Sequence, residues 1–241
     1  MIISKFKMNC NSYHIYMVRH GESIWNLDSK FTGWTDIPLT NNGVNEAKRI
    51  GDTLRKNNIY PTILFSSSLK RSIDTASIIK KSFYENQATG PYTSWRLNER
   101  HYGTLEGIPR QIIRDEYGDK FTKMVRCSYY MKPPIIDISQ NEIDKYPIFK
   151  NCYYNSIRLG ESKENVLERL LPYFENDIMY KLTEKHVPLI VTHKHCARVL
   201  IKHLSQMNEI DFEKYELPNN SIIKLTFDNN MKFQNYTSIL Y

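Results

Sequence analysis

The chain has 241 residues, 41% of them hydrophobic and 24% charged, and its 33 lysines and arginines outnumber 26 acidic residues to give a net charge of +7. These proportions are typical of globular proteins and exclude the disordered and fibrous classes. The positive charge favours anionic partners such as phosphates, but no run of five basic residues and no nucleic-acid-binding signature is present, so we expect no nucleic acid.

In the first half of the chain, apolar strands alternate with amphipathic helices. Residues 14–19 and 62–67 are predicted strands, because each is a short apolar run that ends in a turn. The helix after the first strand has its buried face at Val44, Ala47, Ile50, Gly51 and Leu54. The helix after the second strand has its face at Leu69, Ile73, Ala76, Ile79 and Lys80. This order predicts an α/β fold with a mostly parallel central sheet flanked by helices.

The second half repeats this order and closes with a hairpin. A helix marked by Val166, Leu167, Leu170, Leu171 and Phe174 precedes an apolar strand over residues 187–192, and the next helix begins near Ala197. Residues 222–227 and 231–236 predict an antiparallel edge hairpin with its turn at residues 228–230. Residues 132–161 contain three prolines and predict a long excursion over one face of the sheet. We assign residues 1–12 to an N-terminal extension and residues 13–241 to a single domain.

The most informative segment, Arg19-His20-Gly21-Glu22-Ser23, directly follows the first predicted strand. Ligands of open α/β sheets bind in the crevice beyond the carboxyl ends of the strands, so we expect His20 to project into a ligand-binding crevice. The guanidinium of Arg19 suits phosphate oxygens, and a neutral imidazole at His20 can attack phosphorus. Taken alone, Arg-His-Gly is equally compatible with a chance strand end.

Four further segments accompany this one in a consistent order. They are residues 31–36 (FTGWTD), 69–71 (LKR), 95–103 (WRLNERHYG) and 192–193 (TH). Together the five motifs resemble those of the cofactor-dependent phosphoglycerate mutases, including their bisphosphoglycerate mutase relatives, over about residues 13–236. WRLNERHYG is the most specific, because it separates this branch from phosphatases that share only Arg-His-Gly.

The resemblance implies a phosphoglycerate mutase-like fold and a phosphohistidine mechanism. His20 resembles the nucleophile, His193 the second active-site histidine and Glu99 the general acid–base. Arg19 and Arg71 resemble phosphate-clamping arginines. Further substrate contacts are implied at Ser23, Asn26, Thr32, Gly33, Arg100, Tyr102, Arg110, Arg126 and Lys194.

Without the family, Glu99 is also compatible with a salt bridge to Arg96 or Arg100. The resemblance implies 2,3-bisphosphoglycerate as the primer of the phosphoenzyme, small phosphorylated three-carbon acids as substrates, a place in glycolysis or gluconeogenesis, and a homodimer. We expect no metal, because two histidines flanked by arginines can stabilise a transferring phosphoryl group, and because residues 193–196 (HKHC) lack further ligands at a suitable spacing.

The location follows from what the sequence lacks. Its four cysteines include no C-x-x-C pair, its first residues lack the apolar core of a signal peptide, and no segment approaches the ~18 apolar residues that span a membrane. We therefore expect a cytoplasmic protein with no membrane partner.

Four departures from the family pattern surround the predicted ligand. Lys194-His195 replaces Gly-Asn, Cys127 replaces the second of two adjacent arginines, Arg110 replaces a lysine, and the sequence stops at Tyr241 where relatives continue into a tail that helps cover the site. Three functions therefore stay open. They are a mutase interconverting 3-phosphoglycerate and 2-phosphoglycerate, a bisphosphoglycerate mutase/phosphatase or general phosphatase on the same residues, and a non-catalytic phospholigand-binding protein.

Overall fold

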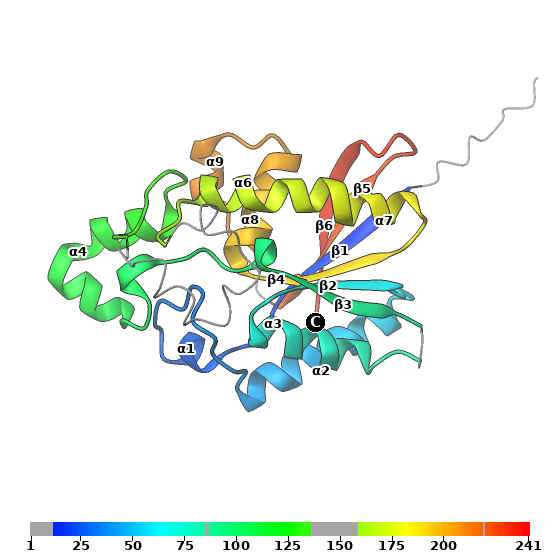
Figure 1. The fold of residues 1–241 in the computed structure, drawn as a ribbon, viewed down its shortest axis with the longest axis horizontal. Coiled ribbons are helices and arrows are strands. Elements are labelled where there is room, and N and C mark those ends of the chain that lie inside the picture. Colours follow the sequence, from blue (N-terminus) through cyan, green and yellow to red (C-terminus); the bar gives the residue numbers. More distant parts are fainter. Residues whose placement is uncertain (1–11, 85–86, 136–158, 219) are drawn as a thin grey trace, which may run out of the picture.

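The computed structural model describes residues 12–84, 87–135, 159–218 and 220–241, and a six-stranded sheet lies at its centre (Figure 1). The strand order is β3-β2-β4-β1-β5-β6. The bounds are β1 Tyr13–Arg19, β2 Ile63–Ser67, β3 Thr89–Ser94, β4 Pro188–Thr192, β5 Ser221–Phe227 and β6 Phe233–Leu240. The first four strands in the order are parallel, whereas β5 is antiparallel to β1 and β6 is antiparallel to β5. The predicted mostly parallel sheet with an antiparallel edge hairpin is confirmed.

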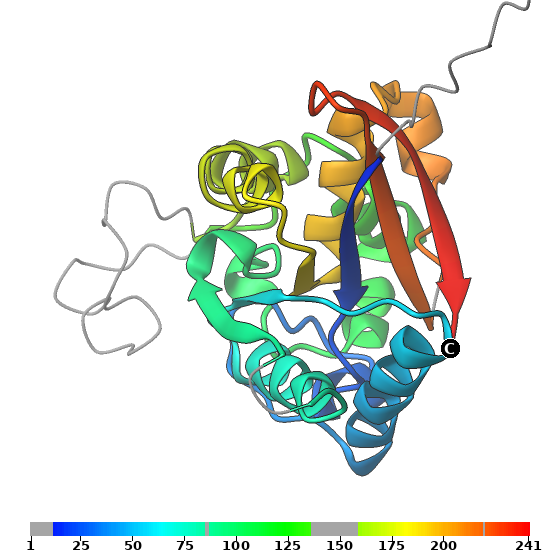
Figure 2. The same ribbon diagram turned by 90° about the vertical axis from the view of Figure 1, so that its right-hand side faces the viewer.

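Helices cover both faces of the sheet (Figure 2). One face carries α2 (Asn41–Lys56) and α3 (Lys70–Lys80), and the other carries α6 (Lys163–Tyr173), α7 (Met179–Thr183) and α8 (Lys194–Leu204). Alternate residues of β1 serve the two layers. Tyr16 and Val18 belong to the core under α2 and α3, and Ile15 and Met17 to the core under α6 and α8. Such alternation is what a strand buried on both faces requires.

The remaining elements gather near the carboxyl ends of the parallel strands (Figure 1). They are α1 (Ile24–Leu27), α4 (Arg110–Cys127) and short 3-10 turns at Trp95–Leu97 and Gly103–Leu105. Helix α4 consists of two helical pieces joined at Gly118, whose φ of 82° only glycine adopts easily. On the α8 side, α9 (Glu209–Lys214) precedes β5, and a π-helical turn at Phe174–Ile178 joins α6 to α7.

The sequence patterns do not predict β3 or α4, and the reasons are local. A Gly90-Pro91 pair interrupts β3, and α4 buries only Ile113, Thr122 and Val125, too few for a helical period. Helix α8 begins at Lys194, three residues before the predicted start. The predicted extension at residues 1–12, except Ser12, and most of the predicted excursion at residues 132–161 lie outside the described residues.

Candidate active site

The register of two parallel strands brings the predicted histidines together. Arg19, the last residue of β1, is paired with Thr192, the last residue of β4, and the main-chain N–H of His20 donates to the Thr192 carbonyl over 2.9 Å. His20 and His193 therefore leave the sheet side by side. Their ring centroids lie 4.8 Å apart at an interplanar angle of 58°.

A hydrogen bond to the main chain fixes the tautomer of the His20 ring. Its Nδ1 lies 2.7 Å from the Gly21 carbonyl oxygen, and because that oxygen can only accept, Nδ1 carries the proton and Nε2 keeps its lone pair. Burial, aided by the charges of Arg71 and Arg19, holds the pKa of His20 well below its ordinary value of 6.5. The imidazole is therefore neutral at physiological pH, which is the nucleophilic form.

His193 is the first residue before α8 and is completely buried. Its Nε2 lies 2.8 Å from the hydroxyl of Ser67, at the end of β2. Burial, with the charges of Arg71 and the neighbouring His20 next, also holds the pKa of His193 well below 6.5. Residues at the carboxyl ends of three adjacent strands, β2, β4 and β1, thus lie together.

Two arginines lie against this pair. Arg71, 1% exposed at the start of α3, donates from Nη1 to the Thr35 carbonyl over 2.9 Å and from Nη2 to the Gly33 carbonyl over 2.7 Å. Burial lowers the pKa of Arg71 to about 10, which leaves it cationic at neutral pH. Arg71 therefore supplies positive charge while its two bonds fix the loop that carries Gly33. Arg19, partly buried at the end of β1, also lines the pocket.

Glu99 reaches the pocket from an irregular segment that follows the 3-10 turn at Trp95–Leu97. One carboxylate oxygen accepts from the main-chain N–H of Arg100 over 2.8 Å. Burial raises the pKa of the Glu99 carboxyl, and this N–H bond together with Arg71 and Arg19 limits the rise. Within the described part of the chain, Glu99 forms no salt bridge with Arg96 or Arg100, the alternative that the local sequence allows. A carboxyl with a raised pKa is suited to give and take a proton near neutral pH.

Most predicted site residues line one pocket. The pocket's walls include Arg19, His20, Asn26, Thr32, Gly33, Arg71, Glu99, Tyr102, Arg110, Arg126 and Lys194. Ser23 is instead fully buried at the start of α1, where its main-chain N–H donates to the side chain of Asn26. Arg100 is also fully buried, and its guanidinium donates to the carbonyls of Glu161, Val125 and Met131. His193, completely buried beside His20, does not line the pocket either, so three predicted site residues, Ser23, Arg100 and His193, are absent from its wall.

Five further residues line the pocket. They are Phe31, Cys127, His195, Arg198 and Glu216. The family comparison flags Cys127 and His195 only as departures. Arg198 follows Lys194 by four residues on α8, so helical spacing could have found it. Phe31 adjoins the predicted Thr32, whereas Glu216, in the segment after α9, has no signal in the sequence.

The pocket rim has its own contacts. The Lys194 ammonium lies 2.5 Å from a carboxylate oxygen of Glu216, and the hydroxyl of Tyr102 lies 2.7 Å from Nε2 of His195. Arg198 is 2% exposed and donates to the carbonyl of Phe212 over 2.6 Å. In total six cationic side chains face two carboxylates across the pocket, so it suits an anion with several charges.

No group of three histidine, cysteine or acidic side chains among the described residues could hold a metal ion. The imidazoles of His193 and His195 have neighbours of their own in Ser67 and Tyr102. Among the described helices, none is long and apolar enough to cross a membrane.

Comparisons with known proteins agree with this geometry. The pattern of the histidine phosphatase superfamily (branch 1) matches residues 15–236. A 2,3-bisphosphoglycerate-dependent phosphoglycerate mutase of Bifidobacterium longum is 37% identical over 92% of this chain and 89% of its own. Proteins of the same name from Buchnera aphidicola and Staphylococcus carnosus are 38% and 36% identical, over 90% and 91% of this chain and 95% and 96% of theirs.

A mycobacterial glucosyl-3-phosphoglycerate phosphatase has a similar fold. Its TM-score is 0.70 at 19% identity, over 95% of this chain and 98% of that one. The family pattern spans residues 15–236, nearly the whole chain, and the two neutral histidines lie at adjacent strand ends. Together these findings settle the family. This enzyme belongs to the histidine phosphatase superfamily and resembles its 2,3-bisphosphoglycerate-dependent phosphoglycerate mutases.

Proposed function

We propose that this enzyme interconverts 3-phosphoglycerate and 2-phosphoglycerate through a phosphohistidine at His20, primed by 2,3-bisphosphoglycerate. The observation that carries the proposal is a pair of histidine rings 4.8 Å apart, of which His20 lines a pocket with an excess of cations and His193 lies buried beside it. The names of relatives at 36–38% identity support the same reaction. We also propose that the enzyme is a cytoplasmic homodimer that acts in glycolysis or gluconeogenesis.

In the first half-reaction, Nε2 of His20 attacks the phosphorus of the donor. The N–P bond forms as the P–O bond breaks, and Glu99 gives its proton to the leaving oxygen. Arg19 and Arg71 balance the charge on the equatorial oxygens, with His193 beside them. In the second half-reaction, Glu99 takes the proton of the acceptor hydroxyl as its oxygen attacks phospho-His20 and the N–P bond breaks.

The rim residues hold the part of the molecule that is not transferred. Arg110, Arg126 and Arg198 offer guanidinium groups to the carboxylate and the second phosphate, and Tyr102 offers its hydroxyl. Arg100 does not belong to this set, because three main-chain carbonyls occupy its donors. We assign it to holding the segment around Glu99.

A phosphatase is the second candidate, and two rim features favour it. Cys127 supplies no charge where the mutases have an arginine, and Glu216 pairs with the ammonium of Lys194. If the glycerate carboxylate is held weakly, water can hydrolyse phospho-His20 before the bisphosphoglycerate intermediate has reoriented in the pocket. The fold neighbour named as a phosphatase fits this candidate.

One experiment separates these functions. The purified protein is incubated with 3-phosphoglycerate and a trace of 2,3-bisphosphoglycerate, and 2-phosphoglycerate and inorganic phosphate are measured together. The mutase predicts that 2-phosphoglycerate exceeds phosphate and that its formation requires the primer; phosphate in excess would assign a phosphatase. The protein should also carry acid-labile, alkali-stable phosphate that is absent from His20→Ala. Equal labelling of that variant would remove His20 as the nucleophile.

A further inference from the structure

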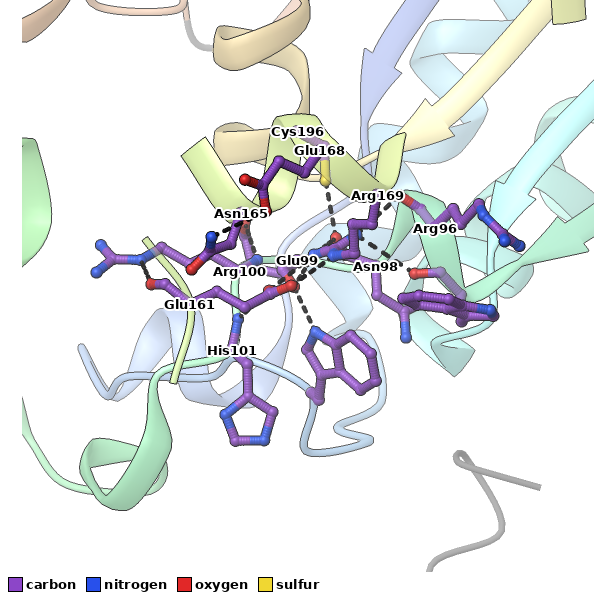
Figure 3. A network of polar contacts seen from close by, with 12 residues as sticks. Arg96, Asn98, Glu99, Arg100, His101, Glu161, Asn165, Glu168, Arg169 and Cys196 are labelled. Atoms are coloured by element: carbon purple, nitrogen blue, oxygen red, sulfur yellow. Dashed lines mark hydrogen bonds and ion pairs between the residues drawn. The ribbon is translucent and has the colours of Figure 1, made fainter. Parts of the chain in front are cut away.

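The segment that carries Glu99 has little regular structure of its own. Between the 3-10 turn at Trp95–Leu97 and the next turn at Gly103–Leu105, its main chain relies on side chains from other elements for hydrogen bonds. Figure 3 shows these contacts, which converge on Arg169 and Glu161. Because a catalytic carboxylate must be held within a fraction of an ångström, the partners of this segment bear directly on Glu99.

Arg169, on α6, spreads its guanidinium along the segment. Its Nη1 donates to the Arg96 carbonyl over 2.7 Å, and its Nη2 donates to the carbonyls of Asn98 over 2.8 Å and Glu99 over 2.9 Å. Three carbonyls within four residues therefore point at one planar cation. The Glu99 carbonyl accepts a second bond from the indole N–H of Trp34 over 2.6 Å.

Glu161 completes the arrangement from just before α6. Its carboxylate binds Nε and Nη2 of Arg169 over 2.6 and 2.9 Å, and the two side chains are 4% and 6% exposed. One of its oxygens also accepts from the main-chain N–H of His101 over 2.8 Å. In addition, the Glu161 main chain donates its N–H to the His101 carbonyl and accepts from Nε of Arg100. Glu161 thus fixes both Arg169 and the two residues that follow Glu99.

We infer that the buried Glu161–Arg169 pair is a positioning device that holds the main chain around Glu99 so that its carboxyl faces His20. The inference rests on the proposed role of Glu99 as general acid–base. Burying an ion pair is costly, and packed apolar side chains often stabilise a fold equally well, so stability alone does not account for the pair. What only this pair supplies is six charge-assisted hydrogen bonds in fixed directions. Arg169 donates three to carbonyls, Glu161 accepts one from the His101 N–H, and two join the pair itself.

The test compares two phosphate donors. Transfer from 2,3-bisphosphoglycerate to His20 leaves an alkoxide that needs a proton from Glu99, whereas 4-nitrophenyl phosphate leaves a stabilised phenolate that does not. Arg169→Lys keeps the charge but cannot bridge three carbonyls. We expect it to lower the rate of His20 phosphorylation by the alkyl donor about tenfold to a hundredfold, with less than a threefold change for the aryl donor. Equal losses with both donors would overturn the inference.

A double-mutant cycle with Glu99→Gln shows whether Arg169 acts through Glu99. If it does, Arg169→Lys causes no further loss with the alkyl donor once Glu99 is replaced. Independent losses that multiply would overturn the inference. The role of Glu99 and the positioning role of the Glu161–Arg169 pair are tested by different results. The role of Glu99 is wrong if Glu99→Gln alone leaves the rate with 2,3-bisphosphoglycerate unchanged.

A stability control and a second variant complete the design. Leu182→Ala opens a cavity in the core that α6 shares and does not line the pocket, so it should lower thermal stability while sparing the ratio of alkyl to aryl rates. If Arg169→Lys does not fold, Glu161→Gln serves instead, because the amide keeps an acceptor for Arg169 but loses the charge. It should show the same selective loss of the alkyl rate, and a normal ratio would contradict the inference.

Discussion

At the scale of single residues, the pairing of Lys194 with Glu216 lowers the positive charge that the pocket rim offers. Their charged atoms lie 2.5 Å apart, with Glu216 65% and Lys194 29% exposed. A partly exposed pair is weak, typically worth up to about 1 kcal/mol, so the carboxylate neutralises Lys194 without locking it. Lys194 can therefore replace the missing guanidinium at Cys127 only in competition with Glu216.

Glu216→Gln should free this ammonium for the substrate. We expect KM for 3-phosphoglycerate to fall about twofold to fivefold, the equivalent of up to about 1 kcal/mol, with kcat nearly unchanged. The matched control is Glu184→Gln, which removes a carboxylate 2.6 Å from Lys181 on α7, away from the pocket. Steady-state kinetics of the two variants side by side give the answer, and an unchanged or higher KM for Glu216→Gln would contradict the competition.

The residues whose position the sequence could predict are those that end or directly follow a predicted strand. His20, His193 and Arg19 belong to this class, because each ends or follows a strand that an apolar run predicts. Arg100 carries a charge in the same motif, but its direction depends on carbonyls from residues 125, 131 and 161, which no local pattern encodes. For the same reason the partner of Lys194 could not be predicted.

At the scale of elements, the turn after β1 is pressed against the first turn of α2. A Cβ at Gly21 would lie 2.2 Å from the Gly43 carbonyl oxygen, and a Cβ at Gly43 would lie 2.1 Å from the Glu22 carbonyl oxygen. Both obstacles are main chain, which cannot rotate away. The Gly21 N–H also donates to Thr75 of α3 over 3.1 Å. The place of the His20 ring is therefore set by two helices as well as by β1.

Gly21→Ala should disturb this packing and move His20. We expect a loss of about 1–3 kcal/mol in unfolding free energy and a fall of about a hundredfold in kcat/KM. The control is Gly51→Ala, farther along α2, whose Cβ would meet the Ser82 side chain at 2.2 Å. That variant should lose stability but keep its activity. If both variants keep the same kcat/KM after correction for folded protein, the turn does not position His20.

Element prediction from sequence succeeded where one face of an element is buried. Helix α2 buries Gly43, Ala47, Ile50, Gly51 and Leu54, nearly the face that its spacing predicts. Strand β3 has no fully buried residue and lies at the sheet edge, so its residues obey no period. What holds it is pairing with β2, a contact that no local pattern shows.

At the scale of the whole molecule, four buried histidines link folding to pH. His20, His101, His193 and His195 are at most 8% exposed, and burial is the largest cause that lowers the pKa of each. The pKa of His101 falls to about 4, and its Nδ1 accepts from the Gly103 N–H over 2.9 Å, which requires the neutral ring. Two of the four, His20 and His195, line the pocket, so the fold keeps basic side chains uncharged there.

The sign of the linkage follows from proton counts. As the pH falls below 6.5, the unfolded chain takes up protons on these histidines while the folded chain does not, so the folded state loses about 1.4 kcal/mol per pH unit for each such proton. Glu99 and Glu106, whose pKa values burial raises, bind protons in the folded state and oppose this loss. The four histidines outnumber these two carboxyls, and burial also lowers the pKa of His14 and, to about 6, that of Lys163, so stability is lost from pH 6.5 towards pH 5.

Urea unfolding at pH 7, 6 and 5 measures how steeply the unfolding free energy falls with pH. One variant shows how much of this slope comes from His101. His101→Asn offers an amide oxygen to the Gly103 N–H in place of Nδ1 but cannot take up a proton, so its unfolding free energy should fall less steeply with acid. The matched control is His203→Asn at the exposed side of α8, which should keep the slope of the unaltered protein. A slope that is flat between pH 7 and 5, or identical in all three proteins, would mean that the buried histidines take up protons without unfolding. Their neutral state would then not be enforced by the fold, and the nucleophilic role proposed for His20 would need another source.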